Sequence, residues 1–89
     1  MYQTYIIYSK STDKYYTGHT SVGIEIRLQR HNDGWTRSTK AGIPWELCYS
    51  ISYDSKSEAI KRECFIKRQK SRTFIENLIK SDENEYKLK

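Results

Sequence analysis

YQTYIIYSKSTDKYYTGHT, residues 2–20, is the stretch of this sequence that decides its fold. The segments 2–9 and 14–20 are rich in Tyr, Ile and Thr, which favour pleated and half-buried strands. Polar residues from Lys10 to Asp13 separate the two segments and carry the signal of a turn. The stretch therefore predicts a hairpin of two antiparallel strands near the start of the sequence.

A helix is expected after the hairpin, from about Val22 to His31. Ile24 and Leu28 have the spacing of one helix face. Thr20 or Ser21 is expected to cap the first turn, because a hydroxyl there can accept a hydrogen bond from a free backbone N–H. The helix is expected to end at the segment Asn32-Asp33-Gly34.

A third strand is expected in the second half of the chain. The polar and basic segment from Trp35 to Pro44 precedes it and is expected to be a surface loop. Beyond this loop, larger apolar residues alternate with smaller ones, a period of two that predicts a strand with one buried face. The larger set is Leu47, Tyr49, Ile51 and Tyr53, and the smaller set is Cys48, Ser50 and Ser52.

Two helices are expected to complete the fold. The segment Ser55-Lys56-Ser57-Glu58 matches a capping box, so a helix should run from there to about Lys70. A further short helix is predicted by four apolar residues on one face, Phe74, Ile75, Leu78 and Ile79. The sequence thus predicts an α+β fold, a small three-stranded antiparallel sheet flanked by helices in the order β-β-α-β-α-α.

The length of 89 residues predicts one domain, expected over residues 1–80, with a polar tail at 81–89 that has little to bury. No apolar run approaches the roughly 18 residues that span a bilayer. The N-terminal segment is too polar for a signal peptide, so a cytoplasmic protein that does not bind membranes is expected. Cys48 and Cys64 are expected to be reduced thiols, because two cysteines so far apart form no disulfide framework or zinc motif.

Positive charge is concentrated in one segment. The whole chain has a net charge of +5, and residues 56–72 alone contain seven Lys and Arg against two Glu. A basic helix of this kind suits a polyanion-binding surface, because contacts to phosphates release condensed counterions. An ordinary solvated lysine-rich face explains the same charge equally well.

Glu63 is the first candidate for chemistry. Ala59, Ile60 and Ile66 define much of the apolar arc of their helix, and Glu63 and Lys67 fall inside that arc. A carboxylate that faces inward is usually paired or binds a metal ion. The pattern alone favours the simpler explanation, an ion pair between Glu63 and Lys67 at i, i+4.

Arg27 and His31 form a second candidate pair, because their spacing places them on one helix face beside the apolar stripe. The guanidinium fork of an arginine matches the oxygens of a phosphodiester and keeps its charge at any working pH. A surface arginine beside a hydrogen-bonded histidine is the ordinary alternative. The eight tyrosines of the chain are mostly explained by packing in the sheet.

The order of these segments resembles the GIY-YIG nuclease domain family, in particular its small stand-alone bacterial type, which is similar to the nuclease module of the excision-repair incision subunit. The resemblance covers nearly the whole chain. It rests on five segments: Thr4-Tyr5-Ile6-Ile7-Tyr8 with Tyr15-Tyr16-Thr17-Gly18, the run from Glu25 to Asn32, Ser38-Thr39-Lys40, Pro44-Trp45-Glu46-Leu47, and the run from Ser57 to Lys67.

The resemblance implies roles for individual residues. Tyr5 and Tyr16 would be the tyrosines of the two motifs, one of which would orient or deprotonate the attacking water. Arg27 would be the catalytic arginine, with His31 nearby, and Glu63 would hold one Mg²⁺ or Mn²⁺ ion. Two further matches are the motif glycine, Gly18, and Asn77 as a candidate for an asparagine that some branches carry.

The function that the resemblance implies is metal-dependent hydrolysis of DNA phosphodiester bonds. The endonuclease would be structure-selective or weakly sequence-specific, and DNA repair and recombination are among the processes it would serve. The alternative is a catalytically silent nucleic-acid-binding module of the same fold. DNA is the expected partner, with room for a targeting protein and no small-molecule cofactor. The candidate DNA contacts are Ser38, Thr39, Lys40, Lys61, Arg62, Lys67, Arg68 and Lys70.

Overall fold

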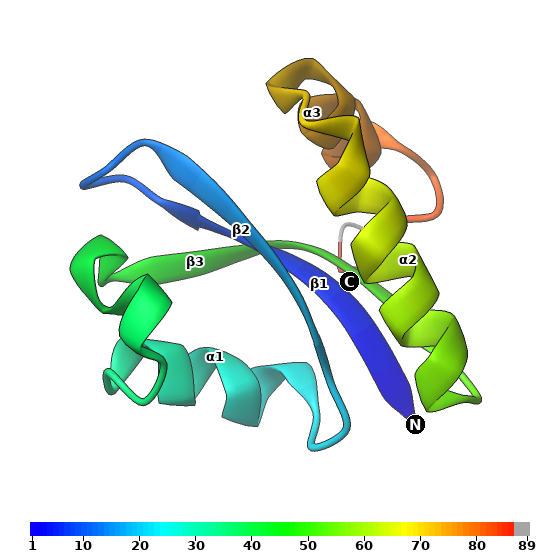
Figure 1. Ribbon diagram of the computed structural model, residues 1–89, viewed down its shortest axis with the longest axis horizontal. Coiled ribbons are helices and arrows are strands. Elements are labelled where there is room, and N and C mark those ends of the chain that lie inside the picture. The colour runs from blue at the N-terminus through cyan, green and yellow to red at the C-terminus, as the bar shows by residue number, and fades with distance from the viewer. Residues whose placement is uncertain (87–89) are drawn as a thin grey trace.

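A three-stranded antiparallel sheet forms the centre of the molecule, with helices on both of its faces (Figure 1). The structure, a computed structural model, describes residues 1–86. The expected fold class and element order are confirmed. The elements are β1 (Tyr2–Ser9), β2 (Lys14–Thr20), α1 (Ile24–Asn32), a 3₁₀ helix η1 (Arg37–Gly42), β3 (Trp45–Tyr53), α2 (Lys56–Gln69) and α3 (Arg72–Lys80).

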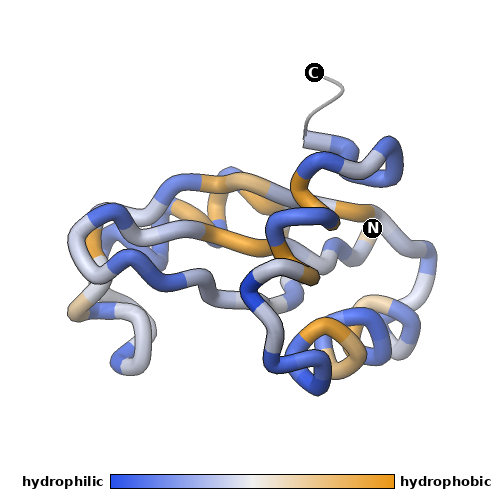
Figure 2. Tube along the Cα trace, turned by 90° about the horizontal axis from the view of Figure 1, so that it is seen from above, coloured by the Kyte–Doolittle hydropathy of each residue, from blue (hydrophilic) through white to orange (hydrophobic). Residues whose placement is uncertain are grey.

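The predicted hairpin is confirmed at the predicted bounds, and its first strand becomes the middle of the sheet. The strand order is β2-β1-β3, so β2 is an edge strand. Tyr5 pairs with Gly18 of β2, and Ile7 pairs with Tyr16, so these four side-chain positions share one face of the sheet. Figure 2 shows the hydrophobic positions of the strands gathered in the middle of the molecule.

Both faces of the sheet carry a hydrophobic core, so the expectation of one buried face on β3 is wrong. The register of β3 shifts between Ile6 and Ile7 of β1, which marks a β-bulge. Because of this shift, Leu47 and Tyr49 lie on opposite faces rather than on the same one. The first core contains Tyr5, Ile7, Ile24 and Trp45 with Leu47 against them, and the second contains Ile6, Tyr49, Ile66 and Leu78.

The start of α1 differs from the expected hydroxyl cap. Gly23 occupies the N-cap position with φ of 93°, a conformation that glycine adopts without strain. The first helical N–H, that of Ile24, donates to the side-chain carbonyl of Gln3 on β1 at 2.9 Å. The Thr20 hydroxyl instead accepts a hydrogen bond from the Val22 N–H, at 3.2 Å, within the preceding turn. The helix ends as expected, with Asp33 at its C-cap.

The segment expected to be a surface loop contains η1, and part of it is buried. Thr39 is 1% exposed, and its backbone carbonyl accepts a hydrogen bond from the indole N–H of Trp45 at 2.7 Å. This contact explains why the segment folds inward, since a buried indole N–H needs a partner.

The two C-terminal helices begin with serine caps. Ser55 accepts a hydrogen bond from the Glu58 N–H at 3.2 Å, as the capping box predicts, and Ser71 caps α3 in the same way. The predicted apolar face of α3 packs in the second core with Ile6. No helix among residues 1–86 is long and apolar enough to cross a membrane.

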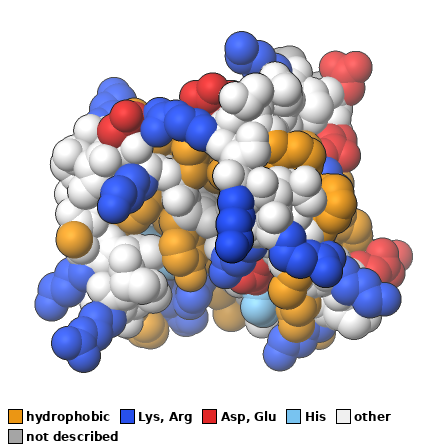
Figure 3. Space-filling view, turned by 45° about the horizontal axis from the view of Figure 1, so that its top comes forward, with side chains coloured by type: hydrophobic (Ala, Val, Ile, Leu, Met, Phe, Trp, Pro, Cys, Tyr) orange, Lys and Arg blue, Asp and Glu red, His pale blue; other side chains and the backbone are white. Residues whose placement is uncertain are grey.

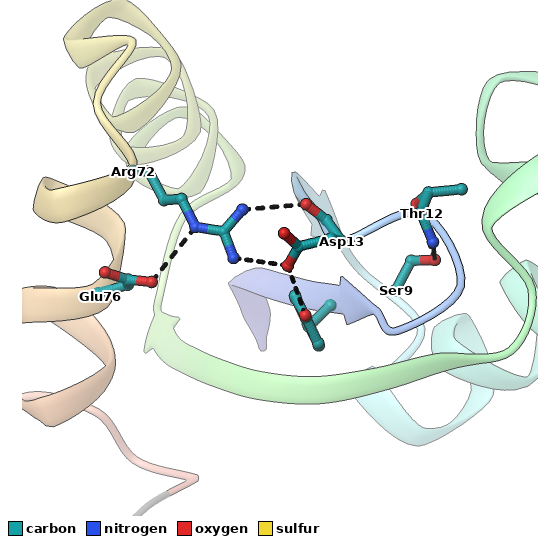
Figure 4. A network of polar contacts seen from close by, with 6 residues as sticks. Ser9, Thr12, Asp13, Arg72 and Glu76 are labelled. Carbon is teal, nitrogen blue, oxygen red and sulfur yellow. Dashed lines mark hydrogen bonds and ion pairs between the residues drawn. The ribbon is translucent and has the colours of Figure 1, made fainter.

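An arginine at the start of α3 holds the hairpin turn (Figure 4). The Arg72 guanidinium donates hydrogen bonds to the backbone carbonyl of Asp13 at 3.0 Å and to its carboxylate at 2.7 Å. Glu76 contacts the same guanidinium at 3.3 Å. The hairpin tip and α3 are therefore fixed to each other although they lie far apart in the sequence.

The segment after α3 is packed, which corrects the expectation that it has little to bury. Asn84 is 1% exposed, and its amide bonds the Ser50 N–H and the carbonyls of Cys48 and Ile79. The Glu85 carboxylate accepts hydrogen bonds from Ser52. Residues 81–86 thus cover the outer edge of β3, and the remainder of the expected tail lies outside the described residues.

Candidate active site

Tyr5 lies at the centre of a hydrogen-bonded cluster between the sheet and α1. Its side chain is fully buried, and its hydroxyl lies 2.7 Å from Nε2 of His31. Nε of Arg27 donates to the same hydroxyl at 3.3 Å. Arg27 and His31 are one helical turn apart, so their predicted common face is confirmed and is directed at β1.

The cluster has a definite direction of hydrogen bonding. The Thr39 hydroxyl donates to the Thr36 carbonyl at 3.2 Å and lies 2.8 Å from Nδ1 of His31. The Thr39 hydroxyl proton is engaged by the Thr36 carbonyl, so Nδ1 of His31 has to donate its proton to the Thr39 oxygen. Nε2 of His31 then carries no proton and accepts from the Tyr5 hydroxyl. The Tyr5 hydroxyl therefore donates to His31 while it accepts from Arg27.

Burial sets the protonation of this cluster. Burial, with the positive charge of Arg27 adding to it, lowers the pKa of His31 to about 4. Burial raises the pKa of Tyr5 to about 12, although Arg27 opposes that shift. At neutral pH, His31 is a neutral imidazole and Tyr5 is a neutral phenol.

The low pKa of His31 predicts that acid destabilises the fold. Below pH 6.5, His31 binds a proton in the unfolded chain but stays neutral in the folded protein. The free energy of unfolding therefore falls as the pH decreases from 6.5 to about 4. The shift corresponds to at most about 3 kcal/mol. We expect the melting temperature of His31→Gln to fall less between pH 7 and pH 4.5 than that of the unsubstituted protein. Equal falls in the two proteins would contradict this assignment.

Gly18 makes room for the Tyr5 ring. A Cβ atom at position 18 would lie 2.6 Å from the Tyr5 hydroxyl oxygen and 3.2 Å from the Tyr16 ring. No side chain fits there unless the tyrosine moves, because Tyr5 is itself held by His31 and Arg27. The glycine of the second motif is therefore a packing requirement of the first motif's tyrosine.

Gly18→Ala is expected to destabilise the protein by about 1–3 kcal/mol, the usual cost of overpacking a filled core. The displaced Tyr5 hydroxyl would also lose its contact with His31. Urea denaturation measures the change in unfolding free energy, and Ala41→Gly, at an exposed position in η1, is a control for the exchange of these residue types. A Gly18→Ala variant as stable as the parent would show that the ring has space to move.

Glu63 lies on α2 in a second cluster. Its carboxylate is contacted by Nδ1 of His19 and by Nζ of Lys67, each at 2.5 Å, and its side chain is 14% exposed. Burial alone would raise the pKa of Glu63, but hydrogen bonds from Lys67 and His19 hold it below its ordinary value. The inward orientation and the Glu63–Lys67 pair expected from the sequence are thus both present.

The two clusters lie on opposite faces of the sheet and meet around the edge of β2. Tyr5 and Tyr16 point to the α1 face, whereas His19, opposite Thr4 in the register, points to the α2 face. Tyr16 connects the clusters, because its ring lies edge-on to His31 at 5.3 Å and 5.6 Å from Nζ of Lys67.

A basic pocket lies where the clusters meet. His19 and Arg27 line it together, and its volume is about 240 Å³. Its other lining residues are Thr20, Ser21, Val22, Arg30 and Lys56, so no carboxylate lines it. An anionic group that entered this pocket would meet cationic side chains from both faces of the sheet.

His19 is a residue that the sequence analysis did not select. The only local signal is its alternation with Tyr15 and Thr17 along β2, which places all three on the face of α2. Its contact with Glu63 joins residues 44 positions apart and depends on how α2 packs. Asn77, the expected asparagine, is exposed, whereas the buried amide of the C-terminal segment belongs to Asn84.

The residues expected to contact DNA are dispersed. Thr39 is buried against His31, so it does not fit a surface contact. Arg62 pairs with Glu83, and Lys67 pairs with Glu63. The remaining members are exposed but lie on different elements: Ser38 and Lys40 on η1, Lys61 and Arg68 on α2, and Lys70 after it.

Glu63 is the residue that could hold a divalent cation. Among residues 1–86, no group of three or more His, Cys, Asp or Glu side chains is suited to a metal ion. One carboxylate is nevertheless compatible with Mg²⁺, which keeps much of its water shell. Glu63 fits this requirement because its low pKa keeps it ionised and because carboxylate oxygens accept further contacts beside those from His19 and Lys67.

Comparison with known proteins identifies relatives over most of the chain. A family model for the GIY-YIG catalytic domain matches residues 1–86. A UPF0213 protein of Streptococcus agalactiae serotype V is 39% identical over 71 residues, which are 79% of this chain and 78% of the relative. A UPF0213 protein of Halobacterium salinarum is 39% identical over 69 residues, or 76% of this chain and 87% of that protein.

A solved structure has the same fold. The solution NMR structure of a UPF0213 protein from Bacillus halodurans superposes with a TM-score of 0.58 at 28% sequence identity. The superposition covers 97% of this chain and 90% of that protein. The names of these relatives state no activity.

Proposed function

The chain belongs to the GIY-YIG catalytic domain family, a nuclease family, and from this premise we propose that it is a metal-dependent endonuclease that hydrolyses DNA phosphodiester bonds. One observation carries the proposal. Arg27 and His19, on opposite faces of the sheet, line one basic pocket, and His19 in turn contacts the Glu63 carboxylate. A phosphate in this pocket would meet the Arg27 guanidinium and lie beside His19, the hydrogen-bond partner of a carboxylate that can hold a cation.

Arg27 would bind the scissile phosphate. Its Nε is oriented by the Tyr5 hydroxyl, which leaves the two terminal nitrogens of the guanidinium for phosphate oxygens. Tyr5 is in turn oriented by His31, and His31 by Thr39. In this proposal the buried chain positions the arginine before substrate arrives, which is how electrostatic stabilisation of a transition state becomes effective.

Tyr16 is a better candidate than Tyr5 for contact with the attacking water. Tyr5 is fully buried, and a pKa of about 12 makes it a poor base. Tyr16 is only half-buried and lies near Nζ of Lys67. We therefore assign the orientation of the water to Tyr16 and the orientation of Arg27 to Tyr5.

Glu63 would hold one Mg²⁺ or Mn²⁺ ion. A divalent ion bound there would supply positive charge against the developing charge on the phosphate and the leaving oxygen. His19 and Lys67 would hold the carboxylate in place for this contact.

The expected substrate is DNA recognised by its backbone and its shape. A helix-turn-helix protein presents a free recognition helix to the DNA. Among the described residues, α2 and α3 do not form such a motif, because α3 is packed in the second core. Contacts to phosphates fix position without reading sequence. Weak sequence preference follows from this, and repair or recombination intermediates are suitable substrates.

One observation favours the second candidate, a nucleic-acid-binding module without catalysis. Both carboxylate oxygens of Glu63 are engaged by cationic partners, which compete with a divalent ion for the same charge. If these pairs persist in solution, the basic pocket would bind phosphate without hydrolysis.

Incubation of the purified protein with Mg²⁺ or Mn²⁺ and a panel of DNA forms tests the proposal. We expect nicks in branched, flapped or single-stranded DNA, and no nicks when EDTA removes the ion. Salt-sensitive binding without cleavage of any DNA or RNA form would contradict the endonuclease and support the binding module.

A further inference from the structure

A groove beside the candidate active site is lined mostly by residues to which the proposed mechanism gives no role, with Tyr16 and Lys67 as the exceptions. It lies between the first half of β2 and the junction of α2 with α3, and its volume is about 420 Å³. Ile66 and Ile75 contribute apolar surface to it. We call it the hairpin groove and define it by its cationic and aromatic lining residues: Lys14, Tyr15, Tyr16, Lys67, Lys70 and Arg72.

The hairpin groove is continuous with the candidate active site. Tyr16 and Lys67 line its wall and also belong to the clusters around Tyr5 and Glu63. Further along β2, the basic pocket with His19 and Arg27 begins. A chain that ran along the edge of β2 would therefore pass from the groove over the Glu63 cluster into the pocket.

The charge of the groove suits a polyanion. Asp13 is the acidic residue of its lining, and Arg72 neutralises it through an ion pair at 2.7 Å. Lys14 and Lys70 are exposed, and within residues 1–86 neither makes an ion pair. Figure 3 shows one face of the molecule on which Lys and Arg side chains are interspersed with hydrophobic and some acidic ones. Basic grooves with aromatic side chains are typical of proteins that bind unpaired nucleic acid.

The groove also offers flat surfaces for stacking. The Arg72 guanidinium lies over the Tyr15 ring, 5.1 Å from its centre, so the two planes form one stack. Asp13 and Glu76 fix the guanidinium in this place (Figure 4). Unpaired bases stack on aromatic rings and on guanidinium planes. Since these groups are held by the fold before a ligand binds, little side-chain entropy is lost on binding.

The size of the groove decides which nucleic acid fits. A volume of about 420 Å³ lies in the range of sites for small molecules and suits one or two nucleotides rather than a duplex. We propose that the hairpin groove binds unpaired DNA nucleotides next to the scissile phosphate, so that the enzyme selects flaps, branches and single-stranded ends. This inference rests on the proposed function and names its substrate class.

Binding measurements on a non-cleaving protein test the groove separately from catalysis. Fluorescence anisotropy would compare a flapped duplex with a blunt duplex of the same sequence, using Glu63→Gln without added metal ion. The test variant is Lys14→Gln with Lys70→Asn, because asparagine tolerates the left-handed backbone of residue 70, which has φ of 48°. The charge-matched control is Lys10→Gln with Arg37→Gln, both at exposed positions outside the groove.

We expect the groove variant to bind the flapped DNA about tenfold more weakly and the blunt duplex nearly as before. The control pair should lose no preference for the flap. Equal losses on both DNA forms, or an equal loss of flap preference in the control, would overturn the inference.

A second variant removes stacking without removing charge. Tyr15→Leu keeps apolar volume against the second core, and Tyr15→Phe keeps the aromatic face, so only the leucine variant should lose flap affinity. Loss in neither variant would contradict stacking on Tyr15. Nicking of blunt and flapped DNA at equal rates by the parent protein would contradict the proposed role of the groove but not the proposed endonuclease activity. Absence of all DNA binding would contradict both proposals.

Discussion

Glu63→Gln should reduce nicking more than about 100-fold while DNA binding remains within a few-fold of the parent. Glutamine has nearly the same shape as glutamate, so α2 should pack as before. Glutamine lacks the negative charge that would hold a divalent cation and that pairs with His19 and Lys67. Gel analysis of nicked products at fixed Mg²⁺, together with anisotropy for binding, measures both effects.

The matched control for this prediction is Glu25→Gln, which removes one negative charge from an exposed position at the start of α1. It should nick at the parent rate, because a change of net charge alone has little effect at physiological ionic strength. Normal nicking by Glu63→Gln would exclude Glu63 as the site of a catalytic ion.

Arg27→Lys should reduce nicking by about 10²–10³-fold, the usual loss when a preorganised electrostatic donor is removed. Lysine keeps the positive charge but has no Nε to receive the orientation that Tyr5 provides at 3.3 Å. It also cannot form the paired contacts of a guanidinium with phosphate oxygens. The loss should appear in the rate at saturating DNA, because the phosphate contact strengthens as charge develops.

Arg37→Lys is the control for this exchange, since Arg37 is exposed at the start of η1 and lies outside the pocket. It should leave the nicking rate unchanged. If Arg27→Lys were as active as the parent, a point charge would suffice at this position, and the oriented cluster behind Arg27 would serve stability rather than catalysis.

The candidate site consists of two clusters that are held in place in different ways. In the Tyr5 cluster, Tyr5 and His31 are buried, neutral at pH 7 and fixed by a chain of hydrogen bonds that orients the charged Arg27. The Glu63 cluster is partly exposed and charged. Because the buried Tyr5–His31 pair is fixed by the fold, Arg27 can bind a phosphate and Glu63 a cation without rearrangement of that pair.

Local patterns predicted much of the fold. The bounds of the hairpin, the serine cap of α2 and the apolar face of α3 all follow from residues that are close in sequence. The predicted details that proved wrong depend on distant contacts. The bulge in β3 separates Leu47 from Tyr49, and the packing of Asn84 against Ser50 depends on a strand 34 positions earlier.

For the candidate site, the sequence determined which side chains exist and which share an element: Arg27 with His31 on α1, and Glu63 with Lys67 on α2. Helical periodicity carries that information because it acts over one turn. Only the tertiary structure decided that β2 is the edge around which the two clusters meet, and that His19 contacts Glu63. Those facts depend on sheet order and on the packing of α2, which involve residues too far apart for any local pattern to encode.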